Sequence, residues 1–192
     1  MSHHKIHYFR FKTARMEYER LLETKKIRLR ALEPSDVELL YQWENNTEIW
    51  NVGSTITPFS RQTIRDFIES ASQTDIYAAK QLRLMIDDKE SGKTVGTIDL
   101  FEFDAHNRRA GIGIFVDEPF QQKQLATNAL ECLLTYCKSM LLLHQVYVDI
   151  PTDNSASIKL FTNAGFSEVG VKKDWLFCES KFKDVVVMQK IL

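Results

Sequence analysis

Apolar positions recur along the chain with two spacings, and each spacing predicts a different kind of element. Over 27–31 apolar and polar residues alternate, which is typical of a half-buried strand. Over 61–73 the apolar residues instead return every three or four positions, and Ser60 stands where a helix N-cap is expected. The pattern therefore predicts a strand that starts at Ile27 and a helix that starts just after Ser60.

The same two spacings divide most of the remaining chain into strands and helices. The predicted strands are 27–31, 81–87, 94–104, 109–116, 144–150, 168–177 and 183–192. The predicted helices are 35–45, 61–73, a long helix from about 123 to 141, and a short helix over 155–164. Their order predicts an α/β domain of the α+β type, in which most strands are antiparallel.

Signals for helix starts and ends support two of these helices. Ser35 and Glu38 have the spacing of a capping box, so we expect the first helix to begin there. The last helix is expected to begin at a polar cap, either Asp153 or Asn154. Gly165 should end that helix, because glycine tolerates the left-handed conformation of a helix stop.

Length and composition fit one well-filled domain. The chain has 192 residues, of which 44% are hydrophobic and 27% are charged, enough for one core but not for two full domains. Residues 1–25 mix aromatic and charged residues, with a short helix expected around 16–22, and we interpret them as an N-terminal extension. The domain then covers 26–192. Within it, 47–59 lacks periodicity and is interpreted as a substrate loop.

Charge and hydropathy limit the expected partners. A net charge of -1 argues against a large phosphate-binding surface, so we expect no nucleic-acid partner. No apolar run approaches membrane-spanning length, and the basic residues near the N-terminus leave no room for the hydrophobic region of a secretory signal. We therefore expect no membrane partner and a cytoplasmic location.

Neither the cysteines nor the histidines have the spacing of a metal site. The three cysteines, Cys132, Cys137 and Cys178, are odd in number and lack a Cys-x-x-Cys pair, which disfavours a disulfide framework and a zinc site. We expect them to be small buried apolar groups. The histidines near the N-terminus lack a nearby acidic or Cys partner, so we expect no bound metal.

Three segments resemble the GNAT superfamily of N-acetyltransferases. Residues 154–166, N-S-A-S-I-K-L-F-T-N-A-G-F, resemble the last helix of that superfamily. Residues 106–114, H-N-R-R-A-G-I-G-I, resemble the "RRAEIGI" strand of the branch that holds spermidine acetyltransferases and ribosomal-protein N-terminal acetyltransferases. Residues 121–126, Q-Q-K-Q-L-A, fall where that branch has a Q/R-x-x-G-x-G/A diphosphate loop, and they match it at Gln121 and Ala126.

The resemblance implies a fold and a cosubstrate. The GNAT fold is a mixed, mostly antiparallel twisted sheet of about seven strands flanked by about four helices. The cosubstrate would be acetyl-coenzyme A, whose pantetheine arm would lie along splayed strands that end near 114–116 and 147–150. The implied cofactor contacts are Gly113, Ile114, Phe115, Val116, Gln121, Gln122, Lys123, Gln124, Leu125, Ala126, Asn154 and Phe161.

The diphosphate loop departs from the family pattern at its central glycine, which is Gln124 here. Backbone N–H groups at a helix N-terminus can still bind a diphosphate if the side chains of Gln122 and Gln124 turn outward, and Lys123 adds charge. The conformational tolerance of glycine is lost, so we expect weaker binding. An ordinary helix start that binds no anion is the alternative. Asn154 likewise has two readings, contact with the arm and simple capping.

Acid–base groups for amine acetylation are expected on one strand. In a period-two strand Glu102 and Asp104 share a face, where they would attract a cationic amine and remove its proton through water. A solvated polar face is the alternative. In the relatives a tyrosine of the last helix protonates the leaving thiolate, but this chain has Phe161, for which core packing is the favoured role. Tyr147 is a substitute candidate for that acid.

Three hypotheses for the function follow. The first is acetylation of a small polycation such as spermidine, supported by Glu102, Asp104 and the further acids Glu44, Glu48 and Asp99. The second is acetylation of a protein N-terminus, which needs an open groove rather than a closed acidic pocket. The third is an acetyl-coenzyme A-binding protein with weak or lost catalysis. A homo-oligomer through an exposed strand edge is left open.

Overall fold

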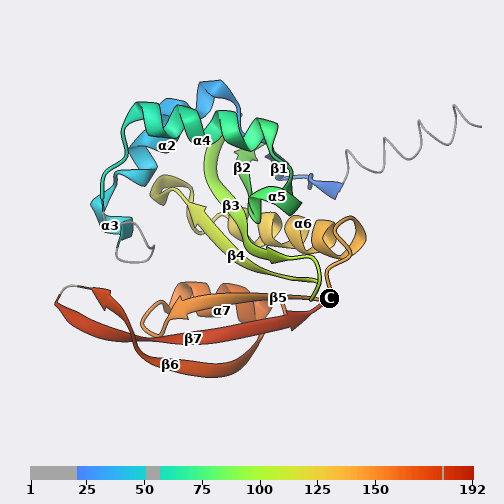
Figure 1. The fold of residues 1–192 in the computed structure, drawn as a ribbon, viewed down its shortest axis with the longest axis vertical. Helices are drawn as coiled ribbons and strands as arrows, with labels where there is room; N and C mark the ends of the chain where they lie inside the picture. Colours follow the sequence, from blue (N-terminus) through green and yellow to red (C-terminus); the bar gives the residue numbers. More distant parts are fainter. Residues whose placement is uncertain (1–20, 51–56, 179) are drawn as a thin grey trace, which may run out of the picture.

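The computed structural model describes residues 21–50, 57–178 and 180–192, which form one seven-stranded sheet with helices on both faces (Figure 1). The sheet order is β1-β2-β3-β4-β5-β7-β6. The strands are β1 Ile27–Arg30, β2 Leu82–Asp88, β3 Lys93–Asp104, β4 Arg109–Val116, β5 Gln145–Pro151, β6 Ser167–Cys178 and β7 Lys181–Ile191. The helices are η1 Pro34–Asp36, α2 Val37–Glu44, α3 Thr47–Trp50, α4 Arg61–Gln73, α5 Ile76–Ala79, η2 Glu118–Phe120, α6 Leu125–Ser139 and α7 Ser155–Asn163.

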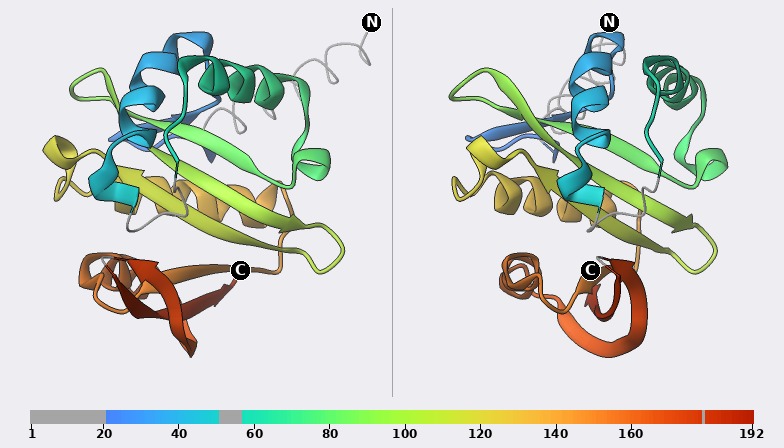
Figure 2. Two further views of the ribbon diagram at one scale, coloured as in Figure 1. Left: turned by 60° about the vertical axis from the view of Figure 1, so that its left-hand side comes forward. Right: turned by 90° about the vertical axis from the view of Figure 1, so that its left-hand side faces the viewer.

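The sheet has two antiparallel parts joined by one short parallel contact. Strands β1 to β4 form one antiparallel part, and β5, β7 and β6 form the other. Strands β4 and β5 pair in parallel only from Arg109 opposite Gln145 to Gly111 opposite Tyr147. Both views in Figure 2 show the two parts as separate layers of the molecule beyond that contact.

Alternating residues of the central strands belong to two hydrophobic clusters, one on each face of the sheet. Leu84 and Ile86 belong to the cluster packed under α6 and α7, whereas Met85 between them packs with α2 and α4. Trp43 of α2 contacts the ring of Phe115 on that second face, with ring centres 5.3 Å apart. The period-two pattern of the strands therefore places α2 and α4 opposite α6, as strand geometry requires.

Most of the predicted elements are confirmed to within a residue or two. Helix α4 begins after Ser60, whose hydroxyl accepts a hydrogen bond from the Thr63 N–H at 3.0 Å. Of the two candidate caps for α7, Asn154 is the N-cap, because its Oδ1 accepts a hydrogen bond from the Ser157 N–H at 3.1 Å. Gly165 closes that helix with φ of 84°. The short helices α3 and α5 were not predicted, because one turn is too short to show a period.

The predicted capping box at Ser35 and Glu38 is wrong. The box is formed instead by Glu33 and Asp36, whose carboxylate accepts a hydrogen bond from the Glu33 backbone N–H at 2.8 Å. Glu38 pairs with Arg61 of α4. The helix start differs because Asp36 pairs with a half-buried arginine on another element, which local spacing does not reveal.

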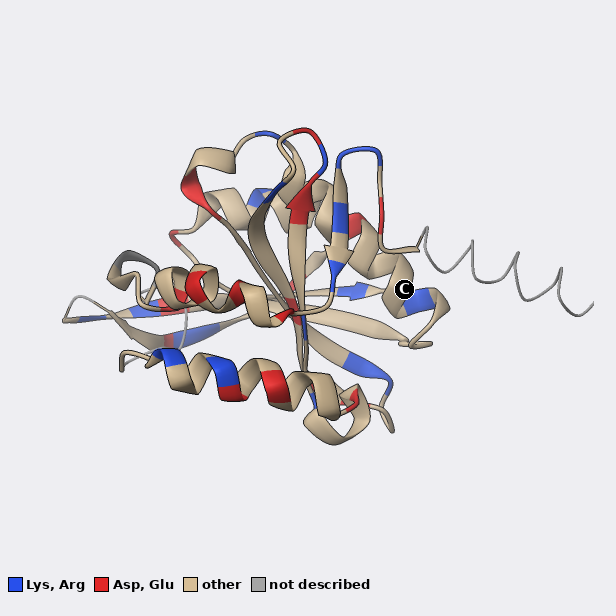
Figure 3. Cartoon of the chain, turned by 90° about the horizontal axis from the view of Figure 1, so that it is seen from above, with Lys and Arg blue, Asp and Glu red and all other residues tan. Residues whose placement is uncertain are grey.

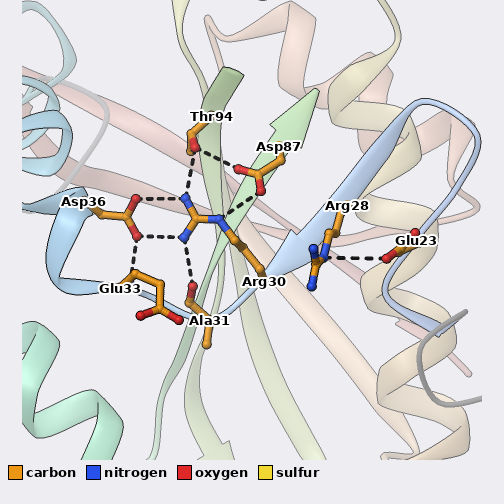
Figure 4. A network of polar contacts seen from close by, with 8 residues as sticks. All are labelled: Glu23, Arg28, Arg30, Ala31, Glu33, Asp36, Asp87 and Thr94. Atoms are coloured by element: carbon orange, nitrogen blue, oxygen red, sulfur yellow. Dashed lines mark hydrogen bonds and ion pairs between the residues drawn. The ribbon is translucent and has the colours of Figure 1, made fainter. Parts of the chain in front are cut away.

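That arginine is Arg30, at the centre of the polar network in Figure 4. Its guanidinium donates to both oxygens of Asp36 at 2.8 Å and to Asp87 at 2.9 Å, and it also contacts Thr94 at 3.0 Å. Burial opposes ionisation of Asp36, but the Arg30 and Glu33 hydrogen bonds outweigh it and hold its pKa below the usual value. The network joins β1, β2, β3 and the start of α2.

The N-terminal extension is described only from residue 21 onward. Glu23 forms a bridge with Arg28, and Leu22 packs against the main cluster. The helix expected around 16–22 lies mostly outside the described residues, and the boundary at residue 25 stays a prediction. The expected substrate loop contains α3, whereas 51–56 lie outside the described residues.

The cysteines are buried and unpaired, as expected. Burial raises the pKa of Cys132 to about 11 and that of Cys137 to about 12, so neither thiol is reactive at neutral pH. In the described parts of the chain, no cluster of three or more His, Cys, Asp and Glu residues is arranged to hold a metal ion.

The surface carries both signs of charge. Seen from above, basic and acidic residues are both spread over the described segments (Figure 3). Along α4, Arg61 and Arg65 precede Asp66 and Glu69. This agrees with the net charge of -1. Within the same segments, no helix is both long and apolar enough to cross a membrane.

Candidate active site

The parallel contact between β4 and β5 ends at Gly111 and Tyr147, and the strands then separate. Figure 1 shows them side by side at one end and apart at the other. Further along β4, Gly113 and Phe115 keep their partners on β3 but have no register partner on β5. Backbone groups on the β5 side of β4 are therefore left for another partner, as the splayed strands expected from the sequence require.

The apex of this opening is lined by aromatic rings. A Cβ atom on Gly111 would lie 2.3 Å from the Phe101 ring, so only glycine lets that ring lie flat against the strand. The Phe101 ring in turn meets the ring of Tyr147 edge-on, with centroids 5.9 Å apart. Gly111 thus fixes the position of Tyr147 through Phe101.

Tyr147 forms a hydrogen bond with Glu102 at the same apex, with the phenol as donor to Glu102 Oε2. Burial, together with the hydrogen bond and negative charge of Glu102, raises the pKa of Tyr147 above its usual value. The hydroxyl is therefore protonated at neutral pH. Two of the predicted catalytic residues are in direct contact.

Asp104 lies apart from this pair. A bulge interrupts β3 between Phe101 and Asp104, and Glu102 takes a left-handed φ of 48° there, so the regular alternation expected for Glu102 and Asp104 is not present. Asp104 closes the following turn by accepting from the Asn107 N–H at 2.9 Å, and it lies 3.5 Å from Arg109. Its carboxylate has partners within its own hairpin.

Two further acids expected on the acceptor side are paired with an arginine that the sequence did not single out. Arg83 of β2 donates to Asp99 of β3 at 2.7 Å and contacts Glu44 of α2. Burial raises the pKa of Asp99 despite the opposing charge of Arg83. Asp99 lies directly opposite Gly113 on β4. The strand register was the available signal, because it sets Arg83 across from Asp99.

The loop before α6 takes a glycine-like conformation although it lacks glycine. Gln122 has φ of 62° and Gln124 has φ of 64°, both in the left-handed region. The Gln124 side chain accepts from Lys26 Nζ at 2.8 Å, while Gln121 Nε2 donates to the Val116 carbonyl at 3.0 Å. The left-handed conformation of Gln122 and Gln124 strains the backbone of the loop. The expectation that both side chains turn outward stays a prediction.

Lysines gather near this helix start. Lys123 Nζ lies 5.0 Å from the centre of the Phe120 ring. A cavity of about 230 Å³ beside it is lined by Lys25, Lys26, Asp88, Lys89, Glu90, Lys123 and Leu125. The side chain of Leu125 is buried in the core, so Leu125 and Ala126 offer backbone groups of the first helical turn rather than polar side chains.

Phe161 of α7 is part of the main hydrophobic core. Only 2% of it is exposed, and its ring packs edge-on against Phe166 with centroids 5.0 Å apart. This agrees with the core-packing role favoured from the sequence. Asn154 at the start of the same helix acts as its cap.

A sheet in which β4 and β5 pair in parallel over one short stretch, with α6 between them in the chain, is the arrangement expected of the class of GNAT acetyltransferases. The family model described as "Acetyltransferase (GNAT) domain" matches residues 26–167. The chain therefore belongs to this family of N-acetyltransferases.

Several relatives have names that state an activity. The chain is 24% identical to spermidine N(1)-acetyltransferase of Escherichia coli K12, over 84% of each chain. It is 29% identical to a putative ribosomal N-acetyltransferase, YdaF, of Bacillus subtilis, over 83% of this chain and 88% of the relative. The crystal structure of spermidine N-acetyltransferase from Vibrio cholerae with CoA and spermine matches the fold with a TM-score of 0.80 at 22% identity, covering 88% of this chain and 96% of that one.

Proposed function

We propose that this N-acetyltransferase transfers the acetyl group of acetyl-coenzyme A to a primary amine of a small polycation, with spermidine as the leading acceptor. The observation that carries the proposal is the pair of Tyr147 and Glu102 at the apex of the β4–β5 opening. A carboxylate there attracts an ammonium, and a protonated phenol can donate its proton to the leaving thiolate. The similarity to spermidine acetyltransferases supports the choice of acceptor.

The pantetheine arm would lie in the opening beyond Gly111. Backbone groups of Gly113 and Phe115 would pair with its amides in the manner of an added strand, and Ile114 and Val116 would line it. A backbone N–H of this segment would polarise the thioester carbonyl as negative charge develops on its oxygen.

The diphosphate would rest at the start of α6. The N–H groups of 122–126 surround the helix N-terminus, where the helix dipole favours negative charge. The lysines that line the cavity beside this helix start support the arrangement, because they add positive charge there; they are Lys25, Lys26, Lys89 and Lys123.

The reaction would proceed by direct attack in a ternary complex. Glu102 takes a proton from the acceptor ammonium, and the freed nitrogen attacks the thioester carbonyl carbon. As the carbon–sulfur bond breaks, Tyr147 gives its hydroxyl proton to the departing thiolate. The proton held by Glu102 then returns along their hydrogen bond to Tyr147, which restores the pair. The attacking nitrogen loses its second proton to water as the amide forms, so one proton of the ammonium ends on the thiol and the other in solvent.

A second candidate acceptor is a protein N-terminus, which is also a primary amine. The 29% identity to the putative ribosomal N-acetyltransferase favours it. A peptide acceptor would need an open groove for the residues that follow its N-terminal amine, whereas a polyamine would need only a closed acidic pocket.

A thiol-release assay with acetyl-coenzyme A tests these acceptors side by side. The panel comprises spermidine, spermine, aminoglycosides, amino acids and short peptides with free N-termini. We expect the highest kcat/KM with spermidine or spermine; a peptide that exceeds them by tenfold would shift the assignment to protein N-termini. Calorimetry with acetyl-coenzyme A is run in parallel, because binding without turnover on any amine would indicate a binding protein.

A homo-oligomer is also proposed. Trp175, Phe177 and Phe182 on the β6–β7 hairpin are 62%, 66% and 62% exposed, and aromatic residues in such numbers are typical of interfaces. Light scattering after size exclusion measures the assembly directly; a monomer at micromolar concentration would overturn this part.

A further inference from the structure

Asp149 stands on β5 just beyond the point where β4 and β5 separate. It follows Tyr147 by two positions and therefore faces the same side of the sheet. On that side Glu102 contacts Tyr147. The sequence did not single out Asp149, because a lone acid within a strand has no distinguishing pattern.

The two carboxylate oxygens of Asp149 have different surroundings. Oδ2 accepts from Lys172 Nζ of β6 at 2.5 Å. Oδ1 is buried and has no hydrogen-bond partner among the described residues. Buried polar atoms almost always have partners, and an unsatisfied one is costly, so a missing donor is the expected explanation.

Lys172 fixes the direction of this carboxylate. Its Nζ also lies 4.8 Å from the centre of the Trp175 ring, which limits where the ammonium can move. The side chains of Asp149 and Lys172 are 31% and 33% exposed, so the pair as a whole is partly accessible to solvent. With Oδ2 held by Lys172, Oδ1 is the carboxylate oxygen that lacks a donor.

We propose that Asp149 binds the acceptor amine, receiving an N–H of its ammonium on Oδ1 and holding it beside Tyr147 and Glu102. This inference rests on the proposed function, since it states how that site recognises its acceptor. Lys172 positions the carboxylate of Asp149. Its positive charge also repels a cation, so Lys172 lowers the affinity for the acceptor amine whereas Asp149 raises it.

An amide of the pantetheine arm offers the same N–H donor without a charge. The two sources are separated by measuring KM for each substrate. Loss of the Asp149 charge raises KM for the amine if the ammonium is the donor, and KM for acetyl-coenzyme A if the arm is.

The experiment compares the full-length wild type with Asp149→Asn, Lys172→Met and a control, Lys173→Met. Lys173 neighbours Lys172 but pairs with Asp184 at 2.7 Å, so its replacement removes a similar ion pair elsewhere. Thiol release is measured with spermidine varied at saturating acetyl-coenzyme A, and then the reverse. Thermal unfolding of each variant is recorded.

We expect Asp149→Asn to raise KM for spermidine by about 10-fold to 100-fold, with KM for acetyl-coenzyme A unchanged. Lys172→Met should lower KM for spermidine by about threefold, and Lys173→Met should leave it unchanged. Opposite effects of the two partners are the signature of acceptor binding, because a merely structural ion pair would lose function from either side. Lys172→Met alone carries this test if Asp149→Asn does not fold.

Three outcomes would overturn the inference. They are an unchanged KM for spermidine in Asp149→Asn, a rise in both Asp149→Asn and Lys172→Met, and a rise in KM for acetyl-coenzyme A instead. In each of these the wild type still acetylates the amine, so the proposed function stands. If the wild type acetylates no amine of the panel, both the function and this inference fall.

Discussion

Arg83 Nε donates to Asp99 Oδ1 at 2.7 Å, directly across from Gly113 where β4 begins to leave β5. The guanidinium also contacts Glu44, so one arginine joins two strands to α2. Two acids that a sequence reading would assign to substrate binding are therefore held by a cation of the protein itself. Glu102, by contrast, accepts a hydrogen bond from Tyr147.

Replacement of Arg83 by Leu should destabilise the fold. It leaves the largely buried carboxylate of Asp99, which is 22% exposed, without its partner, which costs about 3 kcal/mol in the free energy of unfolding. Urea unfolding measures the change. The matched control is Arg61→Leu, whose pair with Glu38 is exposed on both sides, so the loss there should stay below about 1 kcal/mol. Equal losses in both variants would contradict the structural role of Arg83.

Tyr147→Phe should lower kcat while leaving acetyl-coenzyme A binding intact. The substitution keeps the ring that contacts Phe101 and removes only the proton donor, so a loss of about 10²-fold in kcat is expected. Steady-state kinetics and calorimetry make the two measurements. A kcat within twofold of the wild type would exclude Tyr147 as the acid, and a loss of cofactor binding would assign it to binding instead.

Phe161→Tyr should not raise turnover. The Phe161 ring is 2% exposed and packs against Phe166, so a new hydroxyl would be buried without a partner. We expect a cost of about 1–3 kcal/mol in stability and an unchanged kcat. Thermal unfolding and thiol release test both parts. If turnover rises, the added hydroxyl reaches the thiolate, and the lack of an acid at this position limits the wild type.

Gln124→Gly should tighten acetyl-coenzyme A binding. Gln124 has φ of 64°, and glycine adopts this conformation without a Cβ penalty. We expect Kd to fall by about threefold, equivalent to about 0.6 kcal/mol. Gln124→Ala is the matched control, since it removes the hydrogen bond to Lys26 but keeps the strain. Equal gains from both would attribute the effect to the side chain rather than to the backbone.

Asp36→Asn should change how stability depends on pH. The folded-state pKa of Asp36 lies below its unfolded value, so the carboxylate stabilises the fold above about pH 4, and this contribution is lost as the pH falls through the folded-state pKa. At pH 7 the variant should lose about 2 kcal/mol. The difference from the wild type should shrink below about pH 4. A difference that stays constant from pH 7 to pH 3 would argue against an ionised Asp36.

The order of strands and helices could be read from the sequence because it depends on local spacing and caps. Helix caps and stops involve residues only a few positions apart. Each of the three was found where expected: the caps Ser60 and Asn154, and the stop Gly165. The capping box was predicted at the wrong residues. Asp36 forms the observed box, and its position is set by a hydrogen bond from Arg30, which lies on a different element.

The candidate site was only partly predictable. Glu102 and Tyr147 were identified separately, but their contact depends on a bulge in β3 and on the register of β4 with β5. Arg83 and Lys172 have no local signature, since a lysine or arginine on a strand is most often a solvated residue. Their partners are set by cross-strand register.

The sequence by itself determined the family, the elements and the loop that should receive a diphosphate, because hydrophobic period, capping and short motifs act over a few neighbouring residues. Tertiary structure alone decided which acids pair with an arginine and which contact Tyr147. Ion pairs such as that of Arg83 with Asp99 and Glu44 join residues far apart in the chain, so charge balance at the site exists only once the sheet and α2 are assembled.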